Sequence, residues 1–207
     1  MEVKLYGMAG SPNVRGAMLG LAEKGVDYEL VTVLPPFKDP EHMRRNPFGR
    51  VPVLEHDGFL LYETQAILRY VDQAFPGPSL QPTDAHELAR MNQILGIIDC
   101  YLFKSWSGDI GFERLIAPTY FKRPSNLQVI EAALPLARCV ADALDPLIAS
   151  PYLTGATYSL ADIRLAPHFA WFRETPEGQT LLDGKHNLQH WFNTVGERET
   201  VRQVLAQ

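Results

Sequence analysis

The sequence contains few of the residues that mark redox, metal-binding and membrane proteins. Only two cysteines occur in 207 residues, Cys100 and Cys139, and neither has Cys-x-x-Cys spacing or nearby metal ligands. We interpret them as reduced, buried thiols of a cytoplasmic protein, and we expect no metal site. No uncharged apolar run reaches the ~18 residues of a membrane helix, and the first residues do not resemble a signal peptide. We therefore expect a soluble, unprocessed chain that does not bind membranes.

An excess of positive charge is also absent. The formal net charge is −5 and the isoelectric point is about 5.7. Such a chain offers no broad cationic surface for phosphates, which argues against nucleic acid as its main partner. Hydrophobic residues make up 46 % of the chain and charged residues 21 %, as in ordinary globular proteins. The length allows one large domain or two modest ones.

The first third of the chain predicts a small mixed α/β domain. Alternation predicts a strand at Val3 to Tyr6, helical spacing follows Ser11 until Gly25, and Tyr28 to Val33 is rich in strand-forming residues. The prolines from Leu34 to Gly49 predict a loop with at most a short helical turn. The next predicted elements are a hairpin around Asp57-Gly58, with strands 53–55 and 59–62, and a helix over 64–75. The order βαβ, loop, ββα matches the thioredoxin-like fold.

Everything beyond a Pro-rich linker at 76–82 has a helical pattern. We therefore predict a thioredoxin-like domain over 1–76 and an all-helical domain over 83–207. Pro135 is expected to kink or divide the second long helix. The Ser159-Leu160-Ala161-Asp162 segment has the spacing of a capping box, and Asp162 is expected to be a structural cap. The predicted helices cover 84–107, 125–148, 159–170, 188–196 and 200–205.

Two short motifs predict a site for a small anionic peptide. Val51-Pro52 forces extended backbone before the proline, so Val51 can pair its own amide and carbonyl with an extended ligand. Glu63-Thr64 stands where a strand gives way to a helix, and the unpaired amides of a helix start attract a carboxylate. Either motif alone is common, and it is their spacing that points to a binding site.

Together with the two-domain order, these motifs resemble the cytosolic glutathione S-transferases along the whole chain. Asn46-Pro47-Phe48-Gly49 and the Ser-x-x-Asp cap also look like family signatures. The resemblance implies a cis bond between Val51 and Pro52, and it implies that Glu63 and Thr64 receive the γ-glutamyl carboxylate of glutathione. It further implies a homodimer that uses glutathione as co-substrate, with no tightly bound cofactor.

Ser11 is the predicted catalytic residue. Gly10-Ser11-Pro12-Asn13 matches the serine-type members, in which the hydroxyl donates to the glutathione sulfur. The alternative is that Ser11 only caps its helix. Asn13 is a candidate second donor. Tyr6 competes for the thiolate role because other branches use a tyrosine near the end of the first strand, although its alternation suggests packing instead.

The ends of the peptide need charged partners. Lys38 and Arg50 are candidates for the glycine carboxylate, although related enzymes often have a histidine-lysine pair and a glutamine where this chain has Phe37-Lys38 and Arg50. Asp99 is a candidate for the glutathione amino group across a dimer interface, or else a carboxylate turned to solvent.

Aromatic residues near Phe103 and Trp106 predict an apolar pocket for the second substrate. The expected function is conjugation of the glutathione thiolate to hydrophobic electrophiles, with peroxide reduction as an alternative reaction. Two other readings remain: a non-catalytic glutathione-binding or protein-interaction module, and a glutathione-dependent isomerase, although the Ser-Ser-Cys run typical of that isomerase is absent.

Overall fold

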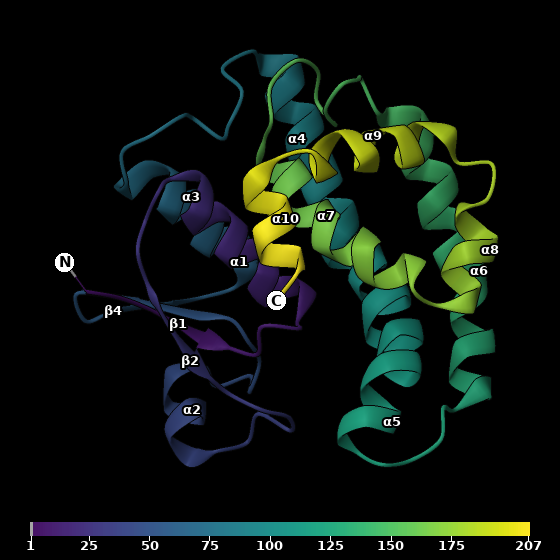
Figure 1. Ribbon diagram of the computed structural model, residues 1–207, viewed down its shortest axis with the longest axis horizontal. Coiled ribbons are helices and arrows are strands. Elements are labelled where there is room, and N and C mark those ends of the chain that lie inside the picture. The colour runs from purple at the N-terminus through teal and green to yellow at the C-terminus, as the bar shows by residue number, and fades with distance from the viewer. Residues whose placement is uncertain (1) are drawn as a thin grey trace. The chain divides into compact units, whose positions relative to one another are not determined.

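The computed structural model describes residues 2–207, and its contacts group them into two units. The first unit contains the residues up to Leu80 together with Glu199–Gln207, and the second contains Gln81–Arg198. The helical domain predicted over 83–207 includes these last nine residues. In the structure the C-terminal helix α10 (Glu199–Leu205) packs on α1 of the first unit through its buried Val201 and Val204 (Figure 1).

A four-stranded sheet in the order β2-β1-β3-β4 forms the first unit's centre. Its strands are β1 (Val3–Gly7), β2 (Glu29–Thr32), β3 (Val53–His56) and β4 (Phe59–Tyr62). β1 and β2 are parallel, with Leu5 opposite Leu30, whereas β1 and β3 are antiparallel, with Leu5 opposite Leu54. This topology confirms the predicted thioredoxin-like fold.

Three further helices complete the first unit, namely α1 (Pro12–Glu23), α2 (Pro40–Arg45) and α3 (Thr64–Ala74). The apolar stripe of α1 is buried, and α1 packs side by side with α3 (Figure 1). The Pro-rich loop contains one short helix, α2, which Asp39 caps by accepting hydrogen bonds from the Glu41 and His42 amides.

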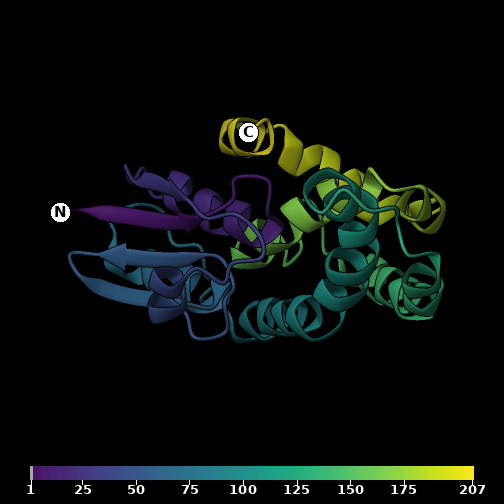
Figure 2. The same ribbon diagram turned by 90° about the horizontal axis from the view of Figure 1, so that it is seen from below.

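The second unit is built of helices joined by loops, as Figure 2 shows from a second side. Its elements are α4 (Ala85–Ile97), the π-helical η1 (Ile98–Ile116), α5 (Ala117–Tyr120), α6 (Leu127–Leu144), the short 3₁₀ turn η2 (Asp145–Leu147), α7 (Leu160–Arg173), α8 (Pro176–Leu182) and α9 (His186–Gly196). The helix predicted to end near Ser107 is prolonged by η1 to Ile116. Pro135 lies inside α6 without dividing it, contrary to one of the two expected outcomes.

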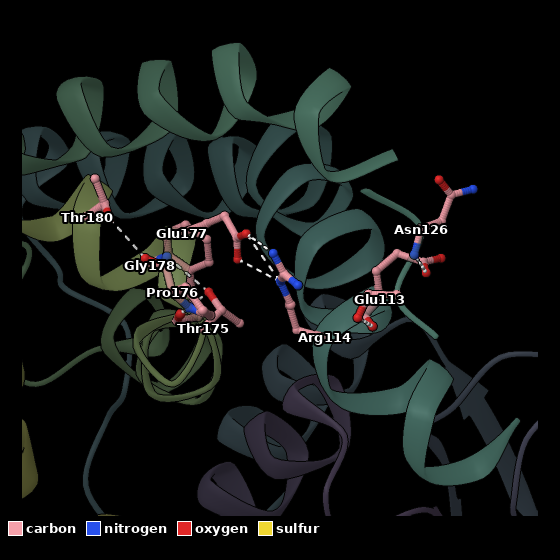
Figure 3. Close-up of polar contacts among 10 residues, drawn as sticks. Glu113, Arg114, Asn126, Thr175, Pro176, Glu177, Gly178 and Thr180 are labelled. Carbon is pink, nitrogen blue, oxygen red and sulfur yellow. Dashed lines mark hydrogen bonds and ion pairs between the residues drawn. The ribbon is translucent and has the colours of Figure 1, made fainter. Parts of the chain in front are cut away.

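Helix α8 was not predicted, and polar contacts explain its position (Figure 3). The Thr175 hydroxyl accepts a hydrogen bond from the Gly178 amide at 3.0 Å and caps the helix. Glu177 then accepts from the Arg114 guanidinium of η1, with Nε 3.1 and 3.2 Å from the two carboxylate oxygens. This ion pair lowers the pKa of Glu177. A helix of seven residues depends on such tertiary contacts, because its few internal hydrogen bonds barely offset the free energy cost of helix nucleation.

The predicted structural role of Asp162 is confirmed. Its fully buried carboxylate accepts hydrogen bonds from the Leu153 amide, the Ser159 amide and hydroxyl, and the Trp191 indole, all at 2.8 to 2.9 Å. Burial raises the pKa of Asp162, and the four donors act in the opposite direction.

The expectation of buried thiols is wrong. Cys100 and Cys139 are both exposed, because each falls on the outer side of its helix next to buried neighbours such as Leu102 and Val140. Within residues 2–207 no helix is long and apolar enough to cross a membrane.

Candidate functional site

Ser11 lies in the turn between β1 and α1, at the position directly before the first helical residue. Its backbone is extended, with φ −73° and ψ 129°, and Pro12 is the first helical residue. The Ser11 amide donates to the Met8 carbonyl at 2.9 Å, and the Arg15 Nε donates to the Ala9 carbonyl at 3.0 Å, so the turn is held by other groups. Among residues 2–207 the partly exposed Ser11 hydroxyl forms no capping bond. The interpretation of Ser11 as a mere helix cap therefore loses its main support.

Tyr6 is engaged in the core of the first unit. The residue is 6 % exposed, and its hydroxyl donates to the Glu55 carboxylate at 2.6 Å. The Arg45 guanidinium lies 4.2 Å from the centre of its ring. Burial and the bond to Glu55 raise the pKa of Tyr6. A phenol that already donates to a carboxylate is poorly suited to bind a thiolate, which agrees with the packing role expected from its alternation.

The Val51-Pro52 peptide is cis, as the resemblance implies. Val51 lies two residues before the start of β3 and is largely buried, at 8 % exposed. No hydrogen-bond partner of its amide or carbonyl is found in the part of the chain that the structure describes. Unpaired backbone groups beside a sheet are suited to an extended ligand.

Glu63 stands just before α3 in an unusual backbone conformation. Its φ is +71°, a value that non-glycine residues adopt at a cost of about 1–3 kcal/mol and mainly at functional sites. The exposed Glu63 side chain makes no capping bond to the helix. Thr64, 7 % exposed, is the first residue of α3. The Glu63 side chain thus leaves the first amides of α3 without a cap from the N-cap position.

Lys38 lies close to the segment that precedes Val51. Gly49 has a φ of +58°, and a β-carbon there would be only 2.9 Å from the Lys38 Nζ. Arg50 is exposed, and Asn13 lies in the first turn of α1. These positions leave the predicted roles of Lys38, Arg50 and Asn13 as proposals.

Two side chains hold the backbone just before Val51 in a way that the sequence did not predict. The Arg50 carbonyl accepts hydrogen bonds from the His42 Nε2 at 3.0 Å and the Asn46 Nδ2 at 2.9 Å. Asn46 belongs to the Asn46-Pro47-Phe48-Gly49 motif on which the family resemblance partly rests. Nothing in the sequence singled out His42, because its partner is a backbone atom eight residues away.

Asp99 belongs to the second unit and forms an ion pair with Arg164 of α7. The Asp99 side chain is 38 % exposed, whereas that of Arg164 is only 3 % exposed. Arg164 also reaches the His168 Nε2 at 3.0 Å, and burial followed by this cation holds the pKa of His168 well below its usual range. The Asp99 carboxylate therefore has a cationic partner within its own unit, and its contact with glutathione remains a proposal.

The assignment of Trp106 to a substrate pocket is wrong for this structure. Trp106 is fully buried, stacks on Phe172 with ring centres 4.3 Å apart, and donates from its indole to the Ala137 carbonyl at 3.1 Å. Its aromatic surface is used to pack η1 against α6 and α7. Phe103 is partly exposed and meets the His168 ring edge-on at 6.3 Å, so it remains a candidate.

A separate hollow of about 380 Å³ lies within the second unit, between α7, α8 and α9. Neither Phe103 nor Trp106 lines it. Its lining residues are Phe169, Arg173, Glu174, Gln179, Leu182, Gln189, Phe192 and Asn193. The described residues include no cluster of three or more histidine, cysteine, aspartate or glutamate side chains that could hold a metal ion.

Two segments of the chain match known protein families. Residues 1–73 match the family model of the glutathione S-transferase N-terminal domain, and residues 125–194 match that of the C-terminal domain. Glutathione S-transferase 4 of Zea mays is 36 % identical over 206 residues, covering 98 % of this chain and 91 % of the relative.

Solved structures agree. Glutathione transferase F7 from Populus trichocarpa superposes with a TM-score of 0.87 at 26 % identity, covering 99 % of this chain and 98 % of that one. Glutathione S-transferase I bound with lactoylglutathione gives 0.85 at 28 % identity, covering 100 % and 99 %. The chain therefore belongs to the glutathione S-transferase family, and it is a transferase of that family.

Proposed function

We propose that this glutathione transferase binds glutathione along Val51 and at Glu63-Thr64, holds its thiolate with Ser11, and transfers it to hydrophobic electrophiles. The observation that carries the proposal is the Ser11 hydroxyl, which sits at the start of α1 and makes no capping bond among residues 2–207. A relative of the same fold was solved with lactoylglutathione bound, which supports a glutathione derivative as the ligand class.

Stabilising the thiolate is the chemical task of the site. A thiol like that of cysteine has a pKa of about 8.5, so only a few per cent is ionised at neutral pH. Lowering this pKa by about two units needs about 2.7 kcal/mol of preferential interaction with the anion. One hydroxyl donor to a charged acceptor contributes about 1.5–3 kcal/mol, and the start of α1 adds a favourable dipole of about 0.3–1 kcal/mol. Together these two contributions amount to about 1.8–4 kcal/mol, a range that includes the required value.

The remaining contacts follow from charge and backbone geometry. The Val51 amide and carbonyl would pair with the peptide backbone of glutathione, and the uncapped start of α3 would receive one carboxylate. Lys38 and Arg50 would attract the glycine carboxylate, and Asn13 and Asp99 remain proposed contacts. Glutathione is the co-substrate, and we propose no tightly bound cofactor. Phe103 is the remaining candidate to contact the electrophile.

We also propose that the enzyme is a cytoplasmic homodimer. Large apolar side chains of the first unit are exposed, namely Phe48 at 62 %, Phe59 at 51 % and Leu60 at 41 %. A partner often covers large exposed apolar side chains, and we propose that a second copy of the chain covers at least some of these. Sedimentation and cross-linking of the purified protein test this assignment.

The decisive experiment compares the wild type with Ser11→Ala. Glutathione binding is measured by calorimetry, and turnover is measured with a panel of aryl halides, hydroperoxides and isomerisable diketo acids. We expect Ser11→Ala to bind glutathione within about threefold of the wild type and to lose about 10- to 100-fold in turnover near neutral pH, because one charge-assisted hydrogen bond is worth about 1.5–3 kcal/mol.

Tyr6→Phe is the matched control, since it also removes one hydroxyl near the end of β1 but one that donates to Glu55. It should leave the pH dependence of turnover unchanged. Unchanged turnover in Ser11→Ala would remove Ser11 from the mechanism. Binding of glutathione by the wild type without turnover of any substrate would instead support a non-catalytic binding module.

A further inference from the structure

We infer that His42 is a positioning residue of the glutathione site, which sets the direction of the Val51 amide by holding the carbonyl of the same peptide unit. The inference rests on the proposed function, because it concerns the backbone groups that would pair with glutathione. It assigns a role to a residue that does not itself contact the ligand.

Two donors from one short stretch of chain converge on a single backbone oxygen. His42 lies in α2 and Asn46 ends it, and their Nε2 and Nδ2 atoms lie 3.0 and 2.9 Å from the Arg50 carbonyl oxygen. Both side chains are almost fully buried, at 1 % exposed each. A carbonyl oxygen has two lone pairs, so the two donors saturate the Arg50 oxygen and fix its direction toward the interior.

Peptide planarity passes this constraint on to Val51. The cis peptides are Pro35-Pro36, Val51-Pro52 and Ser150-Pro151, so the Arg50-Val51 peptide is trans. In a trans peptide the carbonyl of one residue and the amide of the next lie in one plane and point in opposite directions. Since the Arg50 carbonyl points at buried donors, the Val51 N–H must point away from them. That N–H has no hydrogen-bond partner in the described part of the chain, so we propose that glutathione supplies the acceptor.

The helix that carries His42 is itself anchored. The Asp39 carboxylate accepts from the His42 amide at 3.1 Å and from the Glu41 amide at 2.9 Å. The Asn46 amide donates to the His42 carbonyl at 2.9 Å, and the Asn46 side-chain oxygen accepts from the Phe48 amide at 3.0 Å. The two donors therefore belong to one braced turn, and the Arg50 carbonyl is held by a rigid support.

The tautomer of His42 follows from the same contacts. Its Nε2 faces a carbonyl oxygen, which can only accept, so Nε2 must carry a proton. Its Nδ1 is buried without a hydrogen-bond partner among the described residues. A buried polar atom left unpaired costs stability, which a plain apolar side chain would avoid. The hydrogen bond from Nε2 to the Arg50 carbonyl offsets part of this cost.

The test compares His42→Leu with His42→Gln. Leucine fills similar space without a donor, whereas the amide nitrogen of glutamine lies the same number of bonds from the backbone as the histidine Nε2. We expect His42→Leu to raise the dissociation constant and the KM for glutathione about fivefold, the value of one ordinary hydrogen bond. The KM for the electrophile should stay within twofold, and His42→Gln should restore glutathione affinity to within twofold of the wild type.

The outcomes separate this inference from the proposed function. Calorimetry with glutathione and with S-methylglutathione is run on the wild type first, and failure of the wild type to bind either would refute the proposed function. If the wild type binds and His42→Leu binds equally well, the inference is wrong. It is also wrong if the leucine and glutamine variants lose affinity equally, because a merely structural histidine would give that result.

A further variant covers the case in which His42→Leu does not fold. His42→Asn keeps an amide donor but places it one bond too short to reach the Arg50 carbonyl. It should weaken glutathione binding relative to His42→Gln, and equal affinities of these two variants would overturn the inference. His190→Phe, at an exposed position of α9, is the control and should bind glutathione like the wild type.

Discussion

A buried ion pair in the first unit gives the sharpest stability prediction. The Lys24 Nζ lies 3.0 Å from the Asp72 Oδ1, and the two side chains are only 2 % and 5 % exposed. Lys24 also donates to the Pro78 carbonyl at 2.8 Å, and Asp72 accepts from the Leu80 amide at 2.9 Å. The pair thus ties the end of α1 to α3 and to the last residues of the first unit.

Removing one charge of this pair leaves the other buried without its partner of opposite charge. We predict that Lys24→Met, which keeps the apolar stem, costs about 3–5 kcal/mol in the free energy of unfolding, because the Asp72 carboxylate loses its cation and the Pro78 carbonyl loses its donor. At about 2–4 °C per kcal/mol for a chain of this size, the melting temperature should fall by roughly 6–20 °C. Asp72→Asn should cost a similar amount, since it strands the ammonium instead.

A double-mutant cycle distinguishes the ion pair from simple packing. The double variant Lys24→Met/Asp72→Asn should cost about 2–3 kcal/mol less than the sum of the two single variants, because it leaves neither charge buried without its partner. Urea denaturation followed by circular dichroism measures the free energies. Lys104→Met is the matched control, because the Lys104–Asp109 pair is 3.0 Å long but its lysine side chain is 69 % exposed. That variant should cost no more than about 1 kcal/mol. Additive costs in the cycle, or a loss under 1 kcal/mol for Lys24→Met, would refute the reasoning.

Two further predictions concern the helical unit. Asp162→Asn should lower the free energy of unfolding by more than about 3 kcal/mol, because the amide NH₂ group would face other donors such as the Trp191 indole. Thermal melting measures this loss, and a loss below about 1 kcal/mol would contradict the prediction. Arginine partners lower the pKa values of Glu113 and Glu177 in the folded chain. As the pH falls toward and below about 4.5, the ordinary value, the unfolded chain therefore binds more protons than the folded chain. Stability should therefore decrease as the pH falls from about 5 to 3, and less steeply in the double variant Glu113→Gln/Glu177→Gln; equal slopes would show that these carboxylates do not contribute.

The sequence by itself determined the fold class and the order of elements in the first unit. Alternation, helical spacing and the Asp57-Gly58 turn act between near neighbours. The predicted strand at Val3 to Tyr6 and the predicted helix over 64–75 therefore end within one residue of β1 (Val3–Gly7) and α3 (Thr64–Ala74). The capping box from Ser159 to Asp162 was also predicted correctly, because its residues are close neighbours in the chain.

Only the tertiary structure decided what depends on residues far apart in the chain. It showed that α10 packs on α1, that α8 is held by the Arg114–Glu177 pair, and that Trp106 is core. It also showed that His42 holds the Arg50 carbonyl. A short motif contains the chemistry of its own side chains, but burial and backbone hydrogen bonds are set by which distant segments pack together, and no local pattern records that choice.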